Sequence, residues 1–390
     1  MTAPARTATG VNVVAIACSV AALAIAVGSG WLFLDMHRGE PIVAGPGVTA
    51  QATLSDHGPE LRGGPGDTPV YDLSGATPGG TFMLLGGTHP QEIAGLLAAV
   101  IVIENATVTQ GRVLVVPQAN QSGFTHTEPM EGLPHTFAID TPGGQRWFRA
   151  GMRLANPVDQ WPDPDVHVHR VSGEEMVGLE SRNLNRNHPG HTPGALLAEV
   201  SHALITMAKD ENVNVLLDMH EAQPEYPVIN KMVAHENAFE TAATAQYLMS
   251  IEGVDISLDS SPKNLHGLSH REFGDYTQAQ AILTESANPG MGRFRGRTDE
   301  DLLVNGRDVN YAAAAPMGRL FVPFDEKGWP LVLRVARQLS SVRNILDAYN
   351  ELNPDNQIVV EGIPSYEDVL ANGLGAYLKP PPAGDSRPFA

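Results

Sequence analysis

The stretch of residues 81–92 constrains the fold of this chain more than any other feature of its sequence. Residues 81–85 form a short apolar run that two glycines end, which is typical of a buried strand followed by a turn. Pro90 suits the first position of a helix, because its missing N–H would have no partner there. The sequence therefore predicts a strand, a turn with His89 as the N-cap, and a helix with Glu92 at its third position.

The rest of the chain repeats this alternation of apolar strands and amphipathic helices. Such alternation predicts an α/β layered domain in which helices connect mostly parallel strands. We expect the first helix to end near residue 105. The further strands are expected at residues 112–116, 213–217, 280–284 and 320–324, and the further helices at residues 194–209, 236–251 and 331–350.

The N-terminal part of the chain contains an uncharged apolar run at residues 11–34. A segment of about 20 apolar residues can cross a bilayer, and the apolar core of a signal peptide is usually shorter. We therefore favour an uncleaved transmembrane anchor, after a short tail of residues 1–10. A signal peptide cleaved near residues 28–30 is the alternative. The default orientation places the large domain outside the cytoplasm.

The composition of the remaining chain indicates its segment boundaries and excludes some functions. With 390 residues, the chain is long enough for one large domain. Residues 35–79 are rich in Gly, Pro, Asp and Thr and are expected to be a linker, residues 80–351 the main domain, and residues 352–390 a C-terminal extension. A net charge of −19 argues against nucleic acid as a partner. The single cysteine, Cys18, lies in the apolar run, which excludes disulfides and cysteine ligands from the domain.

Polar side chains stand at the ends of three predicted strands. His89 and Glu92 follow the first strand, His220 follows residues 213–217, and Glu285 follows residues 280–284. The carboxyl ends of parallel strands meet at one edge of a sheet, where ligands bind. Two histidines and one glutamate can form an open zinc site, and a separate carboxylate can act as the base. The ordinary alternative is that His89 and Glu92 only cap a helix.

Five motifs in this order resemble those of a known family. They are Gly86-Gly87-Thr88-His89-Pro90-Gln91-Glu92, Val116-Pro117-Gln118-Ala119-Asn120, Asn183-Leu184-Asn185-Arg186 with Pro189-Gly190, Leu217-Asp218-Met219-His220-Glu221, and Thr284-Glu285. Together they resemble the succinylglutamate desuccinylase and aspartoacylase branch of the zinc carboxypeptidase superfamily. The resemblance covers roughly residues 81–289.

This resemblance implies a three-layer α/β/α zinc-carboxypeptidase-like domain with a mostly parallel mixed sheet. It implies that His89, Glu92 and His220 bind one zinc ion, Zn²⁺, and that Glu285 is the general base. By the same resemblance, Asn185 and Arg186 hold a carboxylate of the substrate. Arginine suits that role, because its rigid fork matches a carboxylate with two parallel hydrogen bonds.

Three features depart from the family pattern. Asn183 stands where the family usually has aspartate. A second arginine of the family, which polarises the scissile carbonyl, precedes the Asn-Arg pair, and four arginines of this chain compete for that role: Arg146, Arg149, Arg153 and Arg182. The smaller C-terminal β domain of the family is not evident after Phe324.

The predicted function is hydrolysis of an amide bond next to a carboxylate, with water activated by zinc as the nucleophile. The family resemblance favours an N-acyl amino acid deacylase that acts on a small carboxylate-bearing amide. One alternative is a zinc carboxypeptidase that acts on peptides or on cell-wall stem peptides. Another alternative is a metal-free binding module on a hydrolase fold. In each case the chain is predicted to be a single-pass membrane protein with its large domain extracytoplasmic.

The remaining polar residues near these motifs have simpler interpretations. His167 and His169 are expected on the surface, because their segment is rich in Pro and Asp. His266 and His270 could line the pocket or belong to an ordinary loop. Asp218 is expected to support His220 rather than to bind metal, because it lies two residues earlier on the same strand face. Glu221 should face the opposite side.

Overall fold

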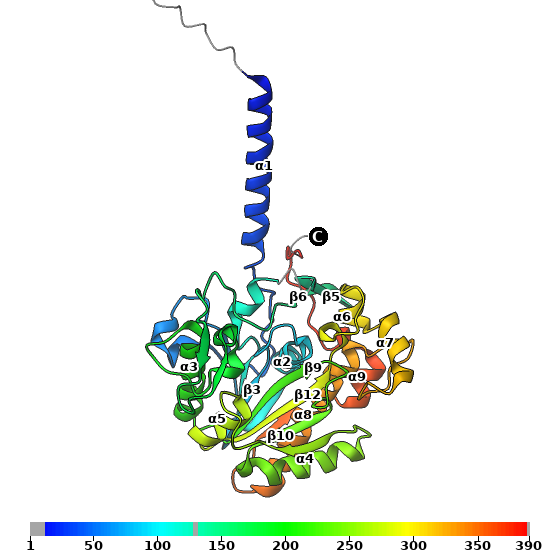
Figure 1. Ribbon diagram of the computed structural model, residues 1–390. Helices are drawn as coiled ribbons and strands as arrows, with labels where there is room; N and C mark the ends of the chain where they lie inside the picture. The colour runs from blue at the N-terminus through cyan, green and yellow to red at the C-terminus, as the bar shows by residue number, and fades with distance from the viewer. Residues whose placement is uncertain (1–11, 128–131, 388–390) are drawn as a thin grey trace, which may run out of the picture.

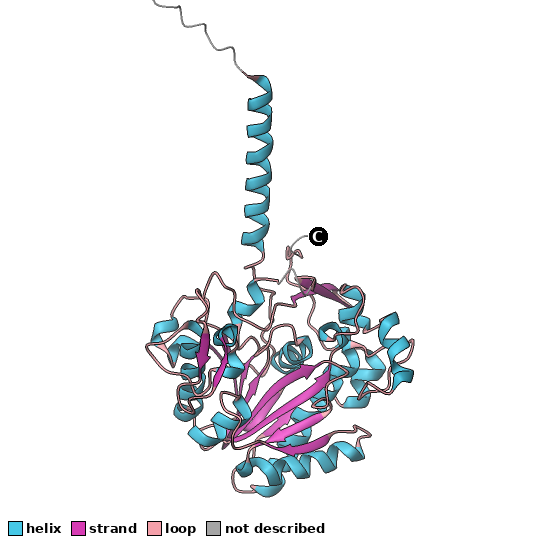
Figure 2. Ribbon diagram, in the orientation of Figure 1, coloured by secondary structure: helices cyan, strands magenta, loops and turns pink. Residues whose placement is uncertain are grey.

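The computed structural model describes residues 12–127 and 132–387, and it shows an α/β domain built on one mixed sheet (Figures 1 and 2). Nine of the described strands form this sheet. In order across it they are β1 (Ala50–Thr53), β2 (Pro69–Ser74), β4 (Thr107–Val116), β3 (Thr77–Leu85), β9 (Val215–Ala222), β12 (Gln280–Ala287), β10 (Lys231–Ala234) and β11 (Ser257–Ser260), and β13 (Val359–Glu361) pairs with β4. Two separate hairpins are β5 (Thr136–Thr141) with β6 (Gly144–Arg149), and β7 (Val166–Val168) with β8 (Glu175–Val177).

Four neighbouring strands in the middle of the sheet, β4, β3, β9 and β12, run parallel. Every residue of β9 is buried, as expected of a parallel strand that is covered on both faces. Their common direction brings the carboxyl ends of these strands to one edge of the sheet. In the pairing of β12 with β9, Glu285 lies directly opposite His220.

Helices cover both faces of the sheet, as the layered pattern predicts (Figure 2). One face packs against α2 (Ile93–Asn105), α4 (Phe239–Ile251) and α8 (Leu331–Leu352). The other face packs against α3 (Leu196–Asp210) and α5 (Ser269–Tyr276). The shorter helices are α6 (Glu300–Asn305), α7 (Val309–Ala314) and α9 (Tyr366–Asn372). The three-layer α/β/α prediction is therefore confirmed.

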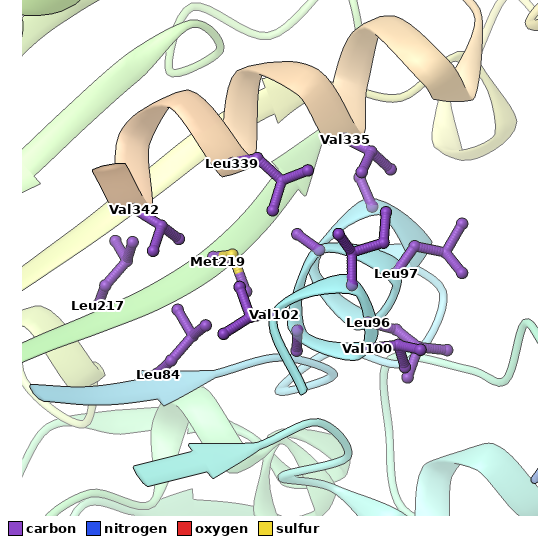
Figure 3. Packing of buried hydrophobic residues seen from close by; sticks show 14 of the residues in the cluster. Leu84, Leu96, Leu97, Val100, Val102, Leu217, Met219, Val335, Leu339 and Val342 are labelled. Carbon is purple, nitrogen blue, oxygen red and sulfur yellow. The ribbon is translucent and has the colours of Figure 1, made fainter. Parts of the chain in front are cut away.

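The core between the sheet, α2 and α8 explains why α2 is almost entirely apolar. Leu84 of β3 and Leu217 of β9 point toward α2 and α8, and Leu339 projects from α8 into the same space (Figure 3). Successive strand residues alternate between faces, so Met83 belongs to the opposite cluster with α3 and α5. Within α2, every residue from Ile93 to Glu104 is buried.

The predicted start of the first helix is wrong by three residues. His89 was expected as the N-cap, but α2 begins at Ile93 with Glu92 in the N-cap position. The turn stays open because its side chains bond elsewhere. His89 and Glu92 contact each other, and the second carboxylate oxygen of Glu92 accepts the backbone N–H of Glu221 on β9. These contacts compete with winding the turn into the helix.

Three other segments differ from the sequence prediction. Residues 50–79 of the expected linker contribute β1 and β2 to the sheet, and the expected extension contributes β13 and α9. Residues 320–324 form no strand. Instead, Val322 and Phe324 pack with Tyr311 and Trp329 in a separate apolar cluster. This packing explains why apolar residues recur in this segment although it is not a strand. After residue 324, the described part of the chain contains α8, β13 and α9 and no further β domain.

The N-terminal apolar run forms a helix, α1 (Val13–Asp35), which stands away from the domain (Figure 1). Its 23 residues have a mean hydropathy of 2.2 in their most apolar stretch and are long enough to cross a membrane, a property that a signal sequence would share. The chain after α1 is bound to the domain. His135 donates to the carbonyl of Met36, and the buried carboxylate of Glu40 accepts from Arg149 and Gln118.

We predict that α1 anchors the protein in a membrane. The full chain should sediment with membranes and resist carbonate extraction, because α1 buries none of its apolar surface in the domain. A chain that starts at Met36 keeps the contacts of Glu40 and should stay in the soluble fraction. A mature N-terminus near residue 30, found by N-terminal sequencing of the expressed protein, would show a cleaved signal instead.

Candidate metal centre and active site

The turn after β3 is tight and is tied to the neighbouring strand. Gly87 has a φ of +66°, and a Cβ at this position would lie 2.7 Å from the ring of Phe124. Glycine is therefore required at this point of the turn. The hydroxyl of Thr88 donates to Asp218 on β9 over 2.8 Å. These constraints carry His89 and Glu92 toward the carboxyl end of β9, where His220 lies.

His89, Glu92 and His220 converge on one point. Glu92 lies between the two histidines, with one carboxylate oxygen 2.7 Å from Nδ1 of His89 and the other 2.9 Å from Nδ1 of His220. The two Nδ1 atoms are themselves 3.2 Å apart. All three side chains are at most 3% exposed. The structure thus brings together the three predicted ligands, which come from positions 131 residues apart at most.

The outer nitrogens of both histidines are held by acceptors. Nε2 of His89 lies 2.9 Å from Oδ1 of Asn183, and Nε2 of His220 lies 2.7 Å from Oδ2 of Asp218. Each Nε2 can therefore donate a proton to its acceptor, which leaves each Nδ1 directed at the centre. Metal-binding histidines typically have this arrangement, in which a second residue orients the ring.

The donor set fits a divalent cation. Against the effect of burial, the carboxylates of Asp218 and Glu92 raise the pKa of His220 well above its usual value, and a divalent cation would take the place of the proton that this imidazole holds. Burial lowers the pKa of His89 to about 4, which keeps this imidazole neutral as a ligand must be. Against the effect of burial, the two histidines hold the pKa of Glu92 well below its usual range. The composition of two histidines and one glutamate is that of open zinc sites.

Glu285 stands beside this centre without binding to it. It lies opposite His220 in the strand pairing, is partly buried, and has one buried carboxylate oxygen without a hydrogen-bond partner among the described residues. Burial raises its pKa to about 8, and the negative charge of Glu92 adds to the shift. A carboxylate whose pKa lies near neutral pH and that forms no ion pair is suited to accept a proton.

A pocket of about 710 Å³ opens over the centre. Its lining includes His89, Glu92 and Glu285, together with Asn185 and Arg186. Arg186 is largely buried, and its guanidinium donates a hydrogen bond to the carbonyl of Asn185. Among the described residues it has no ion-pair partner within 4.0 Å, and it lines the pocket. The two predicted substrate-binding residues thus share one pocket with two of the three predicted ligands and with the predicted base.

Arg153 also lines this pocket, and the other three candidate arginines are engaged elsewhere. They pair with acidic residues: Arg146 with Glu104, Arg149 with Glu40, and Arg182 with Asp163. Arg153 has no ion pair within the described chain. Its positive charge acts on the titration of His89, Glu285 and Arg186, so it lies close to all three.

Comparison with known proteins was made at three levels. No protein-family model matches this chain, and no curated protein matches it. Some solved structures resemble it. They include a succinylglutamate desuccinylase from Silicibacter sp. TM1040, with 16% identity and a TM-score of 0.37 over 58% of this chain and 55% of that chain. The tripeptide-bound cell shape determinant protein Csd4 from Helicobacter pylori has 12% identity and a TM-score of 0.45 over 78% of this chain and 59% of that chain.

A third similar structure is the product-bound ectoine utilization protein EutE (DoeB) from Ruegeria pomeroyi, with 18% identity and a TM-score of 0.35 over 58% of this chain and 55% of that chain. This chain therefore spans little more than half the length of each solved structure. The desuccinylase carries the name of the family that the sequence motifs resemble.

The sequence did not reveal several residues that support the site. Asn183, which stands in place of the family's aspartate, orients His89 through its amide oxygen. Glu221 forms a fully buried ion pair with Arg334 of α8, at 3.1 Å, and Gln338 donates to the carbonyl of His220. A signal was present in α8, because Arg334 and Gln338 are polar residues four positions apart on its buried face.

The structure also gives the positions of Asp218, His270 and His169, which lie outside the ligand set. Asp218 supports His220, as expected, and it accepts further hydrogen bonds from Thr88 and Ser269. His270 lines the pocket, which was one of the two interpretations left open. The prediction that His169 is a surface residue is wrong, since it is 2% exposed. It is buried because its segment folds back against the residues that follow Arg186.

Proposed function

We propose that this chain is a zinc-dependent hydrolase that cleaves an amide bond next to a carboxylate. The observation that carries the proposal is the meeting, at one pocket, of an open ligand set, the carboxylate of Glu285, and two arginines that form no ion pair with the described residues. Each of these groups alone has structural explanations. Together they supply what amide hydrolysis needs: activation of water, a base, and binding of a negatively charged substrate.

His89, Glu92 and His220 would hold the zinc. When bound, zinc supplies a Lewis acid that activates water for attack on an amide carbonyl. Asn183 and Asp218 fix the two imidazole rings so that the Nδ1 atoms stay directed at the ion. A metal-free binding module would give the converging imidazoles and carboxylate no role in binding a ligand, so we favour the hydrolase.

Glu285 would take a proton from the attacking water and deliver it to the departing amine. Its position opposite His220 places it beside the ligand set, and its lack of an ion pair leaves the carboxylate available. Glu221 lines the pocket too, but Arg334 already neutralises it. These contacts support Glu285 over Glu221 as the base.

The two unpaired arginines would bind different parts of the substrate. Arg153 acts electrostatically on both His89 and Glu285, so it is placed to polarise the scissile carbonyl. Arg186, next to Asn185, would hold the substrate carboxylate. A buried guanidinium without a counter-ion is unfavourable, and an anionic substrate would provide the missing partner.

An N-acyl amino acid is the substrate class that we favour, because the sequence motifs resemble a deacylase family. A peptide with a free carboxylate is the second candidate. It is favoured by the pocket volume of about 710 Å³, which lies in the upper part of the usual range of about 300–1,000 Å³. Hydrolysis assays with N-acyl amino acids and with tripeptides would distinguish the two classes by their kcat/KM values.

Arg186→Lys is expected to lower kcat/KM by about 10- to 150-fold with the zinc content unchanged. Lysine keeps the charge but loses one of two charge-assisted hydrogen bonds, each of which is worth about 1.5–3 kcal/mol. Substrates whose carboxylate is amidated should be poor for the wild-type enzyme and nearly insensitive to the substitution. Steady-state kinetics with paired acid and amide substrates would measure both effects.

Arg62→Lys is the matched control, because Arg62 is 66% exposed and lies outside the pocket lining. It should leave both substrates unaffected. Equal losses on acid and amide substrates in Arg186→Lys would contradict the carboxylate-binding role. Arg186 would then act on the carbonyl or support the loop.

A further inference from the structure

A second group of two histidines and one glutamate lies on the far side of the Asn185–Arg186 backbone. His169 follows β7, His266 belongs to the loop before α5, and Glu272 lies on α5. One donor atom from each lies within 4.8 Å of the other two. The side chains of His169 and Glu272 are 3% and 0% exposed, and that of His266 is 26% exposed. The group therefore lies at the edge of the interior, within reach of solvent.

The carboxylate of Glu272 is only half satisfied. Its Oε1 accepts from Nδ1 of His266 and from the backbone N–H of Gly267, both at 2.9 Å. Its Oε2 is buried and has no hydrogen-bond partner among the described residues. A bare carboxylate oxygen in the interior is costly, and such orphaned groups in native proteins require an explanation such as a bound ion. The two hydrogen bonds of Glu272 both go to Oε1, so they do not satisfy Oε2.

His169 can direct a lone pair to the same place. Its Nδ1 lies 2.8 Å from the hydroxyl oxygen of Ser172 and accepts the backbone N–H of Ser172 over 3.3 Å. Its Nε2 lies 2.7 Å from the carbonyl oxygen of His188 and 3.9 Å from Oε1 of Glu272. On zinc binding, Nδ1 would carry the proton and donate it to the hydroxyl of Ser172, in place of accepting the backbone N–H, and Nε2 would become a ligand atom. The carbonyl oxygen of His188 then stands beside it as a fourth donor.

We propose that His169, His266 and Glu272, with the carbonyl oxygen of His188, bind a second zinc ion that has a structural role. The pairing of Glu272 with Nδ1 of His266 at 2.9 Å repeats the pairing of Glu92 with Nδ1 of His89 at 2.7 Å. Tetrahedral zinc ligands lie about 3.4 Å apart, between the 2.9 Å and 3.9 Å contacts of this group. A mixed nitrogen and oxygen donor set is appropriate for zinc.

The ion would cross-link three segments that meet behind Arg186. Nε2 of His167 donates to the carbonyl of Arg186 over 3.2 Å, and the N–H of His188 donates to the carbonyl of Gly267 over 3.3 Å. The second site thus shares its backbone contacts with the stretch that presents Arg186. It contains none of the proposed ligands or the base of the active site, so the inference does not rest on the proposed function.

Metal analysis of five proteins tests the proposal. After equilibration with zinc and removal of the excess, the wild type should retain about two zinc ions per chain. The double variant His266→Ala/Glu272→Gln should retain about one, His220→Ala should retain about one, and the combination of all three substitutions none. His202→Ala, on α3, is the control and should retain the wild-type amount. Glutamine is chosen at 272 because it can still accept the N–H of Gly267.

Two outcomes would overturn the second site: His266→Ala/Glu272→Gln with the wild-type zinc content, or His220→Ala with none. An unchanged zinc content in His220→Ala would instead overturn the active-site assignment. Crystals of the wild-type protein measured at the zinc absorption edge give an answer that does not depend on a folded variant. Two anomalous peaks are expected, one of them between His266 and Glu272, and a single peak at His89 and His220 would refute the second site.

Discussion

Glu285→Gln is expected to lower kcat by about 10²–10⁴-fold while the zinc content stays at the wild-type level. The amide preserves the size of the side chain but cannot accept a proton. Glu285 faces the pocket without an ion pair and is not among the converging ligand atoms, so its loss should leave metal binding intact. Single-turnover hydrolysis, with elemental analysis of the same preparations, would measure both quantities.

The pH dependence gives a second measurement of the same residue. Burial, with the charge of Glu92, raises the pKa of Glu285 to about 8. A base works only when deprotonated, so kcat/KM of the wild type should rise with pH and level off above this pKa. A bound cation favours the carboxylate and would move that limb to lower pH. Glu285→Gln should lose the rising limb.

Glu240→Gln is the matched control, because Glu240 is an exposed carboxylate on α4. It should leave rate, pH profile and zinc content unchanged. A Glu285→Gln enzyme that keeps the rising limb would assign the proton acceptor to another group. Loss of zinc from this variant would mean that Glu285 is a ligand.

The elements that form the site were predictable because their signals are local. A parallel strand covered on both faces is a nearly continuous apolar run. Such runs occur in β3, which leads to His89, and in β9 and β12, which contain His220 and Glu285. The polar residue after each run then marks the edge of the sheet at which these strands end. Once β9 and β12 are parallel neighbours, their register alone places Glu285 opposite His220.

The parts that failed depend on contacts between distant segments. Arg146 and Arg149 pair with acids 42 and 109 residues away, so no local pattern could separate them from Arg153. The strands of residues 50–79 are short, and Gly and Pro around them hide their alternation. The true start of α2 was hidden for a similar reason, since Glu92 is held by the backbone of β9.

His220→Ala is expected to abolish zinc binding at the active site, whereas His202→Ala should not affect it. Removing His220 takes away one of only three protein ligands. It also leaves the buried carboxylate of Asp218 without the histidine that it holds at 2.7 Å. The variant should therefore lose about one zinc ion per chain and all measurable hydrolysis. Elemental analysis and activity assays on matched preparations would show both losses.

Thermal unfolding separates this loss from general misfolding. A ligand that binds only the folded state raises stability by about 2.7 kcal/mol at a concentration 100 times its Kd. Zinc added to the metal-free wild type should therefore raise Tm, and His220→Ala should lose the part of that shift due to the active site. The carboxylates of Asp218 and Glu92 would still be buried in the variant, so its metal-free form should unfold at a lower temperature than the wild type. A folded His220→Ala protein with the full zinc shift and zinc content would exclude His220 as a ligand and remove the basis for the hydrolase.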